Sequence, residues 1–283
     1  MSSPRFALPV LISVLFAISA PELRHIVLAG AGIAVNQPAA TRATAPVEPE
    51  PGRLADRRAD PVTDAVTERI EISIAALAKR VPRLSHPDAL RQAFQAYHNY
   101  RAAHPLRVTK PYLYFVDFGL DSETPRGYVF DMDALTVVEG PFTVAHGRGS
   151  ASGATIPTRF SNEKGSNATS LGLYRAQEIY DFRGRSGGRS YSSVGLRLQG
   201  VSGRFNNAAR TRGIVVHGAP YVSPTSAGRS EGCPAMTEPL ARKLLPRLAN
   251  GGMVFHYSPL HVAWLNEDPW INQGKTGRLA SSD

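Results

Sequence analysis

The chain has 283 residues, enough for one large domain or two small ones, and its 42% hydrophobic and 19% charged residues are typical of a globular protein. The formal net charge of +9 favours anionic partners. The basic residues are spread singly, as in Arg175, Arg183, Arg185 and Arg189. A nucleic-acid groove needs a clustered basic face, so the sequence predicts no nucleic-acid binding.

The chain begins with a short basic stretch ending at Arg5, followed by an apolar run over residues 6–20. This run is shorter than the roughly 20 apolar residues of a membrane span and is typical of a secretory signal. We predict a signal peptide or N-terminal anchor over residues 1–34, followed by a Pro/Ala-rich linker over 35–61. The protein is then expected to be periplasmic or secreted, either released or tethered to the membrane by this segment.

Two amphipathic helices are predicted next. Apolar side chains recur at helical spacing over residues 62–80, and a second apolar stripe covers residues 87–103. Such stripes usually pack into a core, so residues 62–104 are interpreted as a helical lead-in.

From Tyr112 the pattern changes to short apolar runs separated by turn residues, which predicts strands. A short helix is predicted to open at Thr237-Glu238-Pro239 and to end before Gly251-Gly252. The fold class is therefore a mainly β catalytic domain, residues 105–262, preceded by an α-helical lead-in (α+β overall), with a C-terminal tail over 263–283. The predicted strands are 112–118, 127–131, 135–138, 170–174, 195–198, 213–217 and 253–257.

Cys233 is the single cysteine of a chain that we expect to be exported, and so it is either a reactive thiol or a small buried apolar residue. The local sequence favours the reactive thiol. A strand ends at His217, a loop follows, and Cys233 lies in a Ser-x-Gly-Cys turn. Cysteine attacks as the thiolate and needs a base beside it, which His217 can supply. Gly232 lets the backbone amides around Cys233 point toward a developing oxyanion, and Ser230 is expected to hold the turn.

This arrangement resembles the catalytic domain of the L,D-transpeptidase (YkuD-like) family, and in particular its murein L,D-transpeptidase branch. The resemblance covers residues 112–257 and extends more loosely through the preceding helices. The segments that carry it are Val116-Asp117-Phe118, Val144–Ser150, Phe160–Asn162, Gly165-Ser166, Ser170–Gly172, Asn206, His217-Gly218 and Gly228–Ala235.

The resemblance implies a β-sandwich-like domain that acts on peptidoglycan stem peptides. Cys233 would attack the carbonyl of the third stem residue, release the terminal D-alanine and form a thioester, which a neighbouring stem amine would resolve into a 3→3 cross-link. His217 matches the general base, while Gly232 and Cys233 match the oxyanion positions. The resemblance also implies a carbapenem target. Thiolate, base and backbone dipoles suffice for acyl transfer, so no cofactor is expected.

Two positions depart from the pattern of many family members. Glu231 occupies a position that is often histidine, and Ala235 occupies one that is often arginine. Arg229 is our hypothesis for the replacement of that arginine. Two alternatives therefore stay open: an L,D-carboxypeptidase that trims stem tetrapeptides, and a non-catalytic cell-wall-binding protein.

The predicted substrate contacts are less specific than the Cys–His pair. His146 ends a strand and is expected either to line the cleft or to be structural, and Ser161 and Asn162 suit amide or carboxylate binding but are also ordinary turn formers. No metal-ligand motif is present, and nothing indicates an oligomeric state. The predicted substrate-binding set is His146, Ser161, Asn162, Gly218, Tyr221, Arg229 and Ser230.

Overall fold

The computed structural model describes residues 61–273. The predicted signal peptide or anchor over 1–34 and the linker up to residue 60 lie outside the described residues. Within residues 61–273, no helix is long and apolar enough to cross a membrane.

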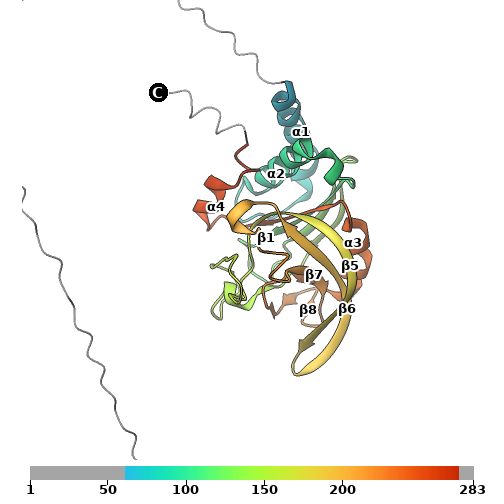
Figure 1. Ribbon diagram of the computed structural model, residues 1–283, viewed down its shortest axis with the longest axis vertical. Coiled ribbons are helices and arrows are strands. Elements are labelled where there is room, and N and C mark those ends of the chain that lie inside the picture. Colours follow the sequence, from blue (N-terminus) through green and yellow to red (C-terminus); the bar gives the residue numbers. More distant parts are fainter. Residues whose placement is uncertain (1–60, 274–283) are drawn as a thin grey trace, which may run out of the picture. The chain divides into compact units, whose positions relative to one another are not determined.

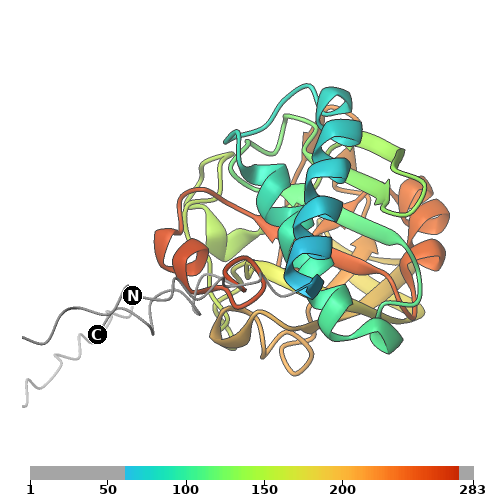
Figure 2. The same ribbon diagram turned by 90° about the horizontal axis from the view of Figure 1, so that it is seen from above.

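The predicted helical lead-in consists of α1 (Pro61–Leu77), a 3-10 turn (Ala78–Arg80) and α2 (Ala89–Ala103). Leu90, Phe94 and Tyr97 are four and three residues apart, so they share one face of α2 and are fully buried. Figure 2 shows α1 and α2 lying together across the strands.

One eight-stranded sheet forms the centre of the domain, in the order β11-β7-β6-β5-β12-β1-β2-β3. The β1–β12 and β7–β11 pairs are parallel, and the other neighbours are antiparallel. Two further sheets, β4–β10 and β8–β9, have two strands each. The strands are β1 (Tyr112–Asp117), β2 (Gly127–Asp131), β3 (Thr136–Phe142), β4 (His146–Gly147), β5 (Gly172–Ser186), β6 (Arg189–Gly200), β7 (Val215–Gly218), β8 (Val222–Ser223), β9 (Ser226–Ala227), β10 (Arg229–Ser230), β11 (Ala235–Met236) and β12 (Met253–Tyr257).

Both faces of the sheet are covered, which explains the nearly continuous apolar runs of its central strands. Side chains alternate along β1, so Leu113 and Phe115 join the core on the α2 side. Tyr114 and Val116 join the opposite core, which includes the buried face of α3 (Glu238–Leu248). The predicted fold class, a mainly β domain behind a helical lead-in, is confirmed.

The middle section differs from the sequence-based prediction. Instead of short strands at 170–174 and 195–198, β5 and β6 form one long hairpin that extends past the rest of the sheet (Figure 1). Beyond Ala176, the two strands pair with each other and leave many side chains exposed. The outer part therefore has no apolar pattern to predict it. Gly187 and Gly188 form the tip with φ of +55° and +78°, values that favour glycine.

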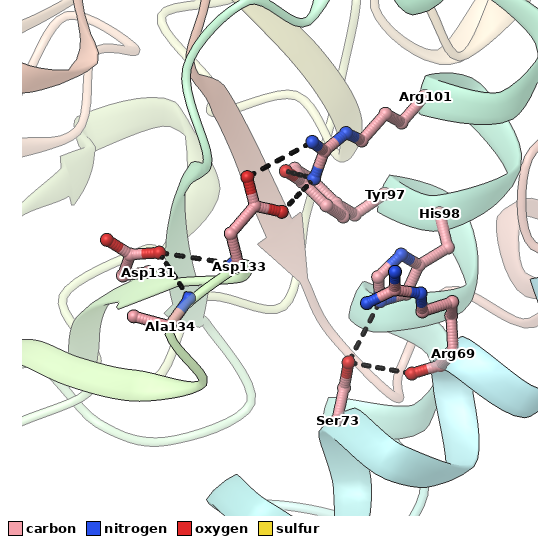
Figure 3. A network of polar contacts seen from close by, with 8 residues as sticks. All are labelled: Arg69, Ser73, Tyr97, His98, Arg101, Asp131, Asp133 and Ala134. Carbon is pink, nitrogen blue, oxygen red and sulfur yellow. Dashed lines mark hydrogen bonds and ion pairs between the residues drawn. The ribbon is translucent and has the colours of Figure 1, made fainter.

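Polar contacts join α2 to the turn after β2 and join α1 to α2 (Figure 3). Arg101 of α2 donates to both carboxylate oxygens of Asp133, at 2.5 and 3.2 Å, in the turn after β2. Ser73 of α1 and His98 of α2 are joined by a 2.9 Å hydrogen bond in a buried position. The Arg101–Asp133 pair is partly exposed, so it fixes position and adds less than about 1 kcal/mol of stability.

The tail expected from residue 263 begins as an ordered helix, α4 (Val262–Glu267). The Trp264 side chain is fully buried in the core on the α2 side, and its indole Nε1–H donates to Asp268 Oδ2 at 2.8 Å. A six-residue helix carries too short a pattern to be recognised, although its tryptophan is itself a signal for burial.

We expect Trp264→Ala to lower the free energy of unfolding by about 3–5 kcal/mol, because it leaves a large cavity and removes the buried hydrogen bond to Asp268 Oδ2. Urea unfolding followed by circular dichroism measures the change. Val262→Ala is the matched control in the same helix, where the side chain is 62% exposed and the loss is expected below about 0.5 kcal/mol. Equal losses for the two variants would contradict this account of α4.

Candidate active site

A cleft of about 1040 Å³ is lined by both residues of the predicted catalytic pair, His217 and Cys233. Its walls come from the β5–β6 hairpin, residues 212–214 before β7 and the segment from β10 to Cys233, with further contributions from Arg148, Gly165 and Asn167. This size is at the upper end for sites that enclose a ligand. The single histidine–cysteine pair expected from the sequence therefore faces one common space.

The parallel pairing of β7 with β11 brings the pair together. Ala235 of β11 is the register partner of His217, so Cys233, two residues earlier, lies beside the start of β7. The Cys233 Sγ lies 3.9 Å from the Gly213 carbonyl oxygen, in a position for a weak S–H donation. Two residues of strand span roughly 6–7 Å, which places the thiol and the imidazole within reach of one substrate.

The imidazole of His217 is fixed on both its edge and its face. Nδ1 lies 2.9 Å from the Gly218 carbonyl oxygen, which can only accept, so Nδ1 carries the proton and Nε2 is the basic nitrogen. The Phe182 ring stacks on the imidazole with centroids 4.1 Å apart and planes 16° apart. Tyr221 approaches edge-on at 6.4 Å.

Burial keeps both reacting groups neutral in the free protein. It lowers the pKa of His217 to about 4, although the Gly218 carbonyl and Glu238 act in the opposite direction. Burial also raises the pKa of Cys233 to about 11, partly offset by the Val215 backbone and the charge of Arg212. The pair is therefore a thiol and an imidazole at neutral pH.

The Ser230–Cys233 turn is held by its own side chains and by close backbone contacts. Ser230 Oγ donates to the Cys233 carbonyl at 2.5 Å and accepts from the Gly232 N–H at 3.2 Å, so Ser230 holds the turn as the sequence predicts. Gly232 has φ of +120°, and a Cβ there would lie 3.1 Å from the Ala168 carbonyl oxygen. A Cβ on Gly147 would lie 2.7 Å from the Gly232 Cα.

These contacts bear on the predicted oxyanion donors. The Gly232 N–H is already engaged by Ser230 Oγ. Among residues 61–273, no acceptor is recorded for the Cys233 N–H. The amide of Cys233 is therefore better suited than that of Gly232 to stabilise an oxyanion, and Gly232 contributes its unusual conformation.

Three of the predicted substrate-binding residues line the cleft: Tyr221, Arg229 and Ser230. Arg229 already donates to protein oxygens, including Ser122 Oγ at 3.1 Å and the Ala154 carbonyl at 2.6 Å. Gly218 does not line the cleft but orients His217 through its carbonyl. Its missing side chain is also required, because a Cβ would lie 2.2 Å from Glu238 Oε2.

His146, Ser161 and Asn162 do not line the cleft. His146 is fully buried, and its Nδ1 accepts from the buried guanidinium of Arg126 at 2.9 Å. Burial and that charge lower the pKa of His146, so it is neutral and supports the β4–β10 pair. The side chain of Asn162 bonds to Asn207 and to the backbone of Arg204 and Ala208. The structural and turn-forming interpretations of these residues therefore describe their positions.

Several residues that line the cleft could not be predicted from the sequence. Phe182, Tyr191, Arg183 and Arg185 come from the outer hairpin, which was not predicted. Arg212 lies five residues before His217 in the chain and also lines the cleft. The only local signal was the arginine content, which by itself did not locate a site.

A thiol, an imidazole oriented by a backbone carbonyl and an available amide in one cleft form an arrangement suited to acyl transfer. Residues 83–257, more than half of the chain, match the family model described as "L,D-transpeptidase catalytic domain". The chain belongs to this family, whose name denotes acyl-transferring enzymes. No curated protein matches the chain.

Solved structures of L,D-transpeptidases are similar to parts of the chain. One from Mycobacterium smegmatis shares 14% identity over 52% of this chain and 58% of its own, with a TM-score of 0.32. One from Stackebrandtia nassauensis shares 15% identity over 61% and 68%, with a TM-score of 0.33. One from Mycobacterium tuberculosis H37Rv shares 16% identity over 52% and 57%, with a TM-score of 0.30. The chain spans less than two thirds of the M. smegmatis and M. tuberculosis proteins.

No group of three or more His, Cys, Asp or Glu side chains that could hold a metal ion occurs within the described part of the chain.

We expect iodoacetamide to alkylate Cys233 of the free protein at a rate that rises roughly tenfold per pH unit between pH 7 and pH 10, because the pKa of about 11 leaves mostly thiol in this range. No step is expected between pH 5 and pH 8, since His217 titrates near 4. Intact-protein mass spectrometry measures the rate, and Cys233→Ala, which removes the single cysteine, is the control. A plateau by pH 8 would reveal a preformed thiolate–imidazolium pair instead.

Proposed function

We propose that the protein is a peptidoglycan L,D-transpeptidase that forms 3→3 cross-links through an acyl-enzyme on Cys233. The observation that carries the proposal is the shared cleft of Cys233 and His217, with the imidazole fixed so that Nε2 is basic. Membership of the L,D-transpeptidase family supports the reaction class and the stem peptide as substrate.

The first half of the reaction transfers the acyl group to sulfur. The Cys233 S–H gives its proton to His217 Nε2 as the sulfur attacks the carbonyl carbon of the third stem residue. The carbonyl oxygen becomes an oxyanion facing the Cys233 N–H. When the intermediate collapses, the C–N bond to the terminal D-alanine breaks and the imidazolium protonates the leaving amine. The products are a thioester and free D-alanine, and His217 is neutral again.

The second half repeats these steps in reverse order with a new amine. The side-chain amine of a neighbouring stem attacks the thioester carbon and loses a proton to His217 Nε2. The C–S bond then breaks, and the imidazolium returns the proton to sulfur. A water molecule in place of the amine would give a tripeptide, so the acceptor decides between transpeptidase and carboxypeptidase.

We also propose that the enzyme works in the periplasm or outside the cell, where the wall lies, with residues 1–34 as its export signal or anchor. The apolar run over 6–20 behind Arg5 supports this assignment. Comparing the N-terminal peptide of the protein recovered from the envelope with that of the full chain tests it. A chain recovered intact from the cytosol would overturn it.

The decisive experiment is mass spectrometry of purified disaccharide tetrapeptides incubated with the full chain, beside Cys233→Ala and His217→Gln. We expect cross-linked dimers lacking one D-alanine with the wild type and none with Cys233→Ala. His217→Gln should reduce the rate by about 10²–10⁴-fold, the usual contribution of a general base.

The other outcomes separate the alternatives. Tripeptide monomers without dimers would show the carboxypeptidase. Retained wall binding in all three proteins, with no turnover and no carbapenem adduct on Cys233, would show a non-catalytic wall-binding protein.

The arginine content of the cleft favours stems with free carboxylates. Five arginines line it against one glutamate, and that carboxylate, Glu231, already pairs with Arg148 at 3.3 Å. Arg183 and Arg185 are exposed on the hairpin, and among the described residues neither takes part in a recorded salt bridge. Anionic stems are therefore attracted to this wall of the cleft.

We expect the double variant Arg183→Gln/Arg185→Gln to raise KM about three- to tenfold for tetrapeptides with free carboxylates, with kcat little changed, because the lost attraction acts on binding. Arg247→Gln, an equally exposed arginine on α3, is the control for net charge. Steady-state D-alanine release at low and moderate salt measures both. An unchanged KM, or the same change in the control, would contradict a role for the hairpin arginines.

A further inference from the structure

Arg212 lies where a single side chain can act on both sides of the nucleophile. It occupies the turn before β7, adjacent in sequence to Gly213, whose carbonyl oxygen is the recorded neighbour of the Cys233 sulfur. The side chain is half-buried and lines the cleft together with Cys233.

The guanidinium is fixed by four neutral oxygens of one segment, residues 161–170. Nη1 donates to the Ser161 carbonyl at 2.8 Å and to Ser170 Oγ at 3.4 Å. Nη2 donates to the Ala168 carbonyl at 2.8 Å and to Ser166 Oγ at 3.2 Å. This arrangement uses the planar fork of arginine, which a lysine cannot reproduce.

The segment that Arg212 holds is the support beneath the nucleophile turn. The Ala168 carbonyl oxygen lies 3.1 Å from the point where a Cβ of Gly232 would be, so the backbone of residue 168 contacts the turn directly. The same carbonyl accepts from Arg212. The Ala168 carbonyl therefore links Arg212 to Gly232. Arg212 is also adjacent in sequence to Gly213, whose carbonyl oxygen lies 3.9 Å from the Cys233 sulfur.

No carboxylate neutralises this charge. Among residues 61–273, Arg212 has no recorded salt bridge, and its recorded hydrogen-bond partners are carbonyls and hydroxyls. Arg229, another arginine near the turn, donates from its Nη atoms to Ser122 Oγ and to the backbone carbonyls of Ala227 and Ala154. The uncompensated charge of Arg212 thus acts on the cleft, where negative charge develops on sulfur and on the oxyanion.

We propose that Arg212 is the positioning residue of the nucleophile: its charge stabilises the Cys233 thiolate, and its guanidinium fixes the 161–170 segment beneath Gly232. The proposal rests on the proposed function only in taking Cys233 as the nucleophile. It replaces our sequence-based hypothesis that Arg229 supplies the basic group near the sulfur.

The test is the alkylation rate of Cys233 by iodoacetamide at pH 9 in the full chain, because this neutral reagent is indifferent to the charge that it approaches. We expect Arg212→Gln to slow alkylation roughly three- to tenfold, and Arg212→Lys, which keeps the charge, to stay within about twofold of the wild type. Arg210→Gln is the matched control: it removes the same charge two residues away, from a surface pair with Glu178. It should leave the rate unchanged.

A second measurement separates the effect of the Arg212 charge from the effect of its hydrogen bonds to residues 161–170. Arg212→Lys restores the charge but not the fork, so we expect transfer of the stem peptide to fall at least tenfold while alkylation is retained. Ser166→Ala, which removes one acceptor and leaves the charge, should keep the wild-type alkylation rate even if Arg212→Gln proves unstable.

Wild-type alkylation in Arg212→Gln, or an equal loss in Arg210→Gln, would overturn the charge effect. Full transfer activity in Arg212→Lys would overturn the role of the Arg212 hydrogen bonds in fixing the 161–170 segment. Alkylation does not depend on a peptidoglycan reaction, so failure of the proposed function would appear separately, as wild-type protein that alkylates normally but forms no product.

Discussion

The parallel pairing of β7 with β11 is the constraint on which the site depends. β11 has only two residues, Ala235 and Met236, and it lies between β7 on one side and Ala145 on the other. The Ala145 N–H donates to the Ala235 carbonyl at 2.8 Å, and both alanines are fully buried in a small apolar cluster. A long basic side chain at position 235 would have to enter this cluster. Alanine there fits the packing of the strand that follows Cys233, so the positive charge that we propose beside the sulfur comes from another element, the turn that carries Arg212.

Burial and charge act in opposite directions on the reacting pair. The enclosure that orients His217 also makes its imidazole a weak base, and loss of solvent around the thiol of the partly buried Cys233 raises its pKa. A neutral resting pair avoids the cost of desolvating two charges. Two of the arginines that line the cleft, Arg212 and Arg229, are held by hydrogen bonds to the scaffold. In the proposed acyl transfer their field is present before the reaction starts, so stabilising the developing negative charge requires little reorganisation.

How much could be predicted from the sequence depends on how far apart in the chain the interacting residues lie. The shared cleft of Cys233 and His217 could be predicted because Cys–His chemistry needs few residue types close together in the chain. Strands such as β1 and β12 could be predicted because burial on both faces leaves apolar runs. The outer hairpin was missed because its strands stabilise each other beyond the core. Arg212 was missed for a related reason: its partners are residues 161–170, and only the folded chain brings them under Gly232. His146 is the reverse case. Its position at a strand end beside a glycine-rich turn is also typical of a site residue, but in the structure it is paired with the buried Arg126.

A glycine of the hairpin allows Phe182 to contact His217, the proposed general base. Gly195 of β6 is the register partner of His217 in β7, and it also pairs across the hairpin with Tyr180. A Cβ on Gly195 would lie 2.8 Å from the Tyr180 ring and 3.0 Å from the Phe182 Cβ. The missing side chain therefore leaves the space in which Phe182 crosses β6 and stacks on the imidazole. An aromatic ring in that space excludes water from one face of His217, which contributes to the burial that lowers its pKa. The ionisation of His217 is thus set partly by strand pairing in the hairpin, so in the proposed mechanism changes in the outer wall of the cleft act on the base as well as on substrate binding.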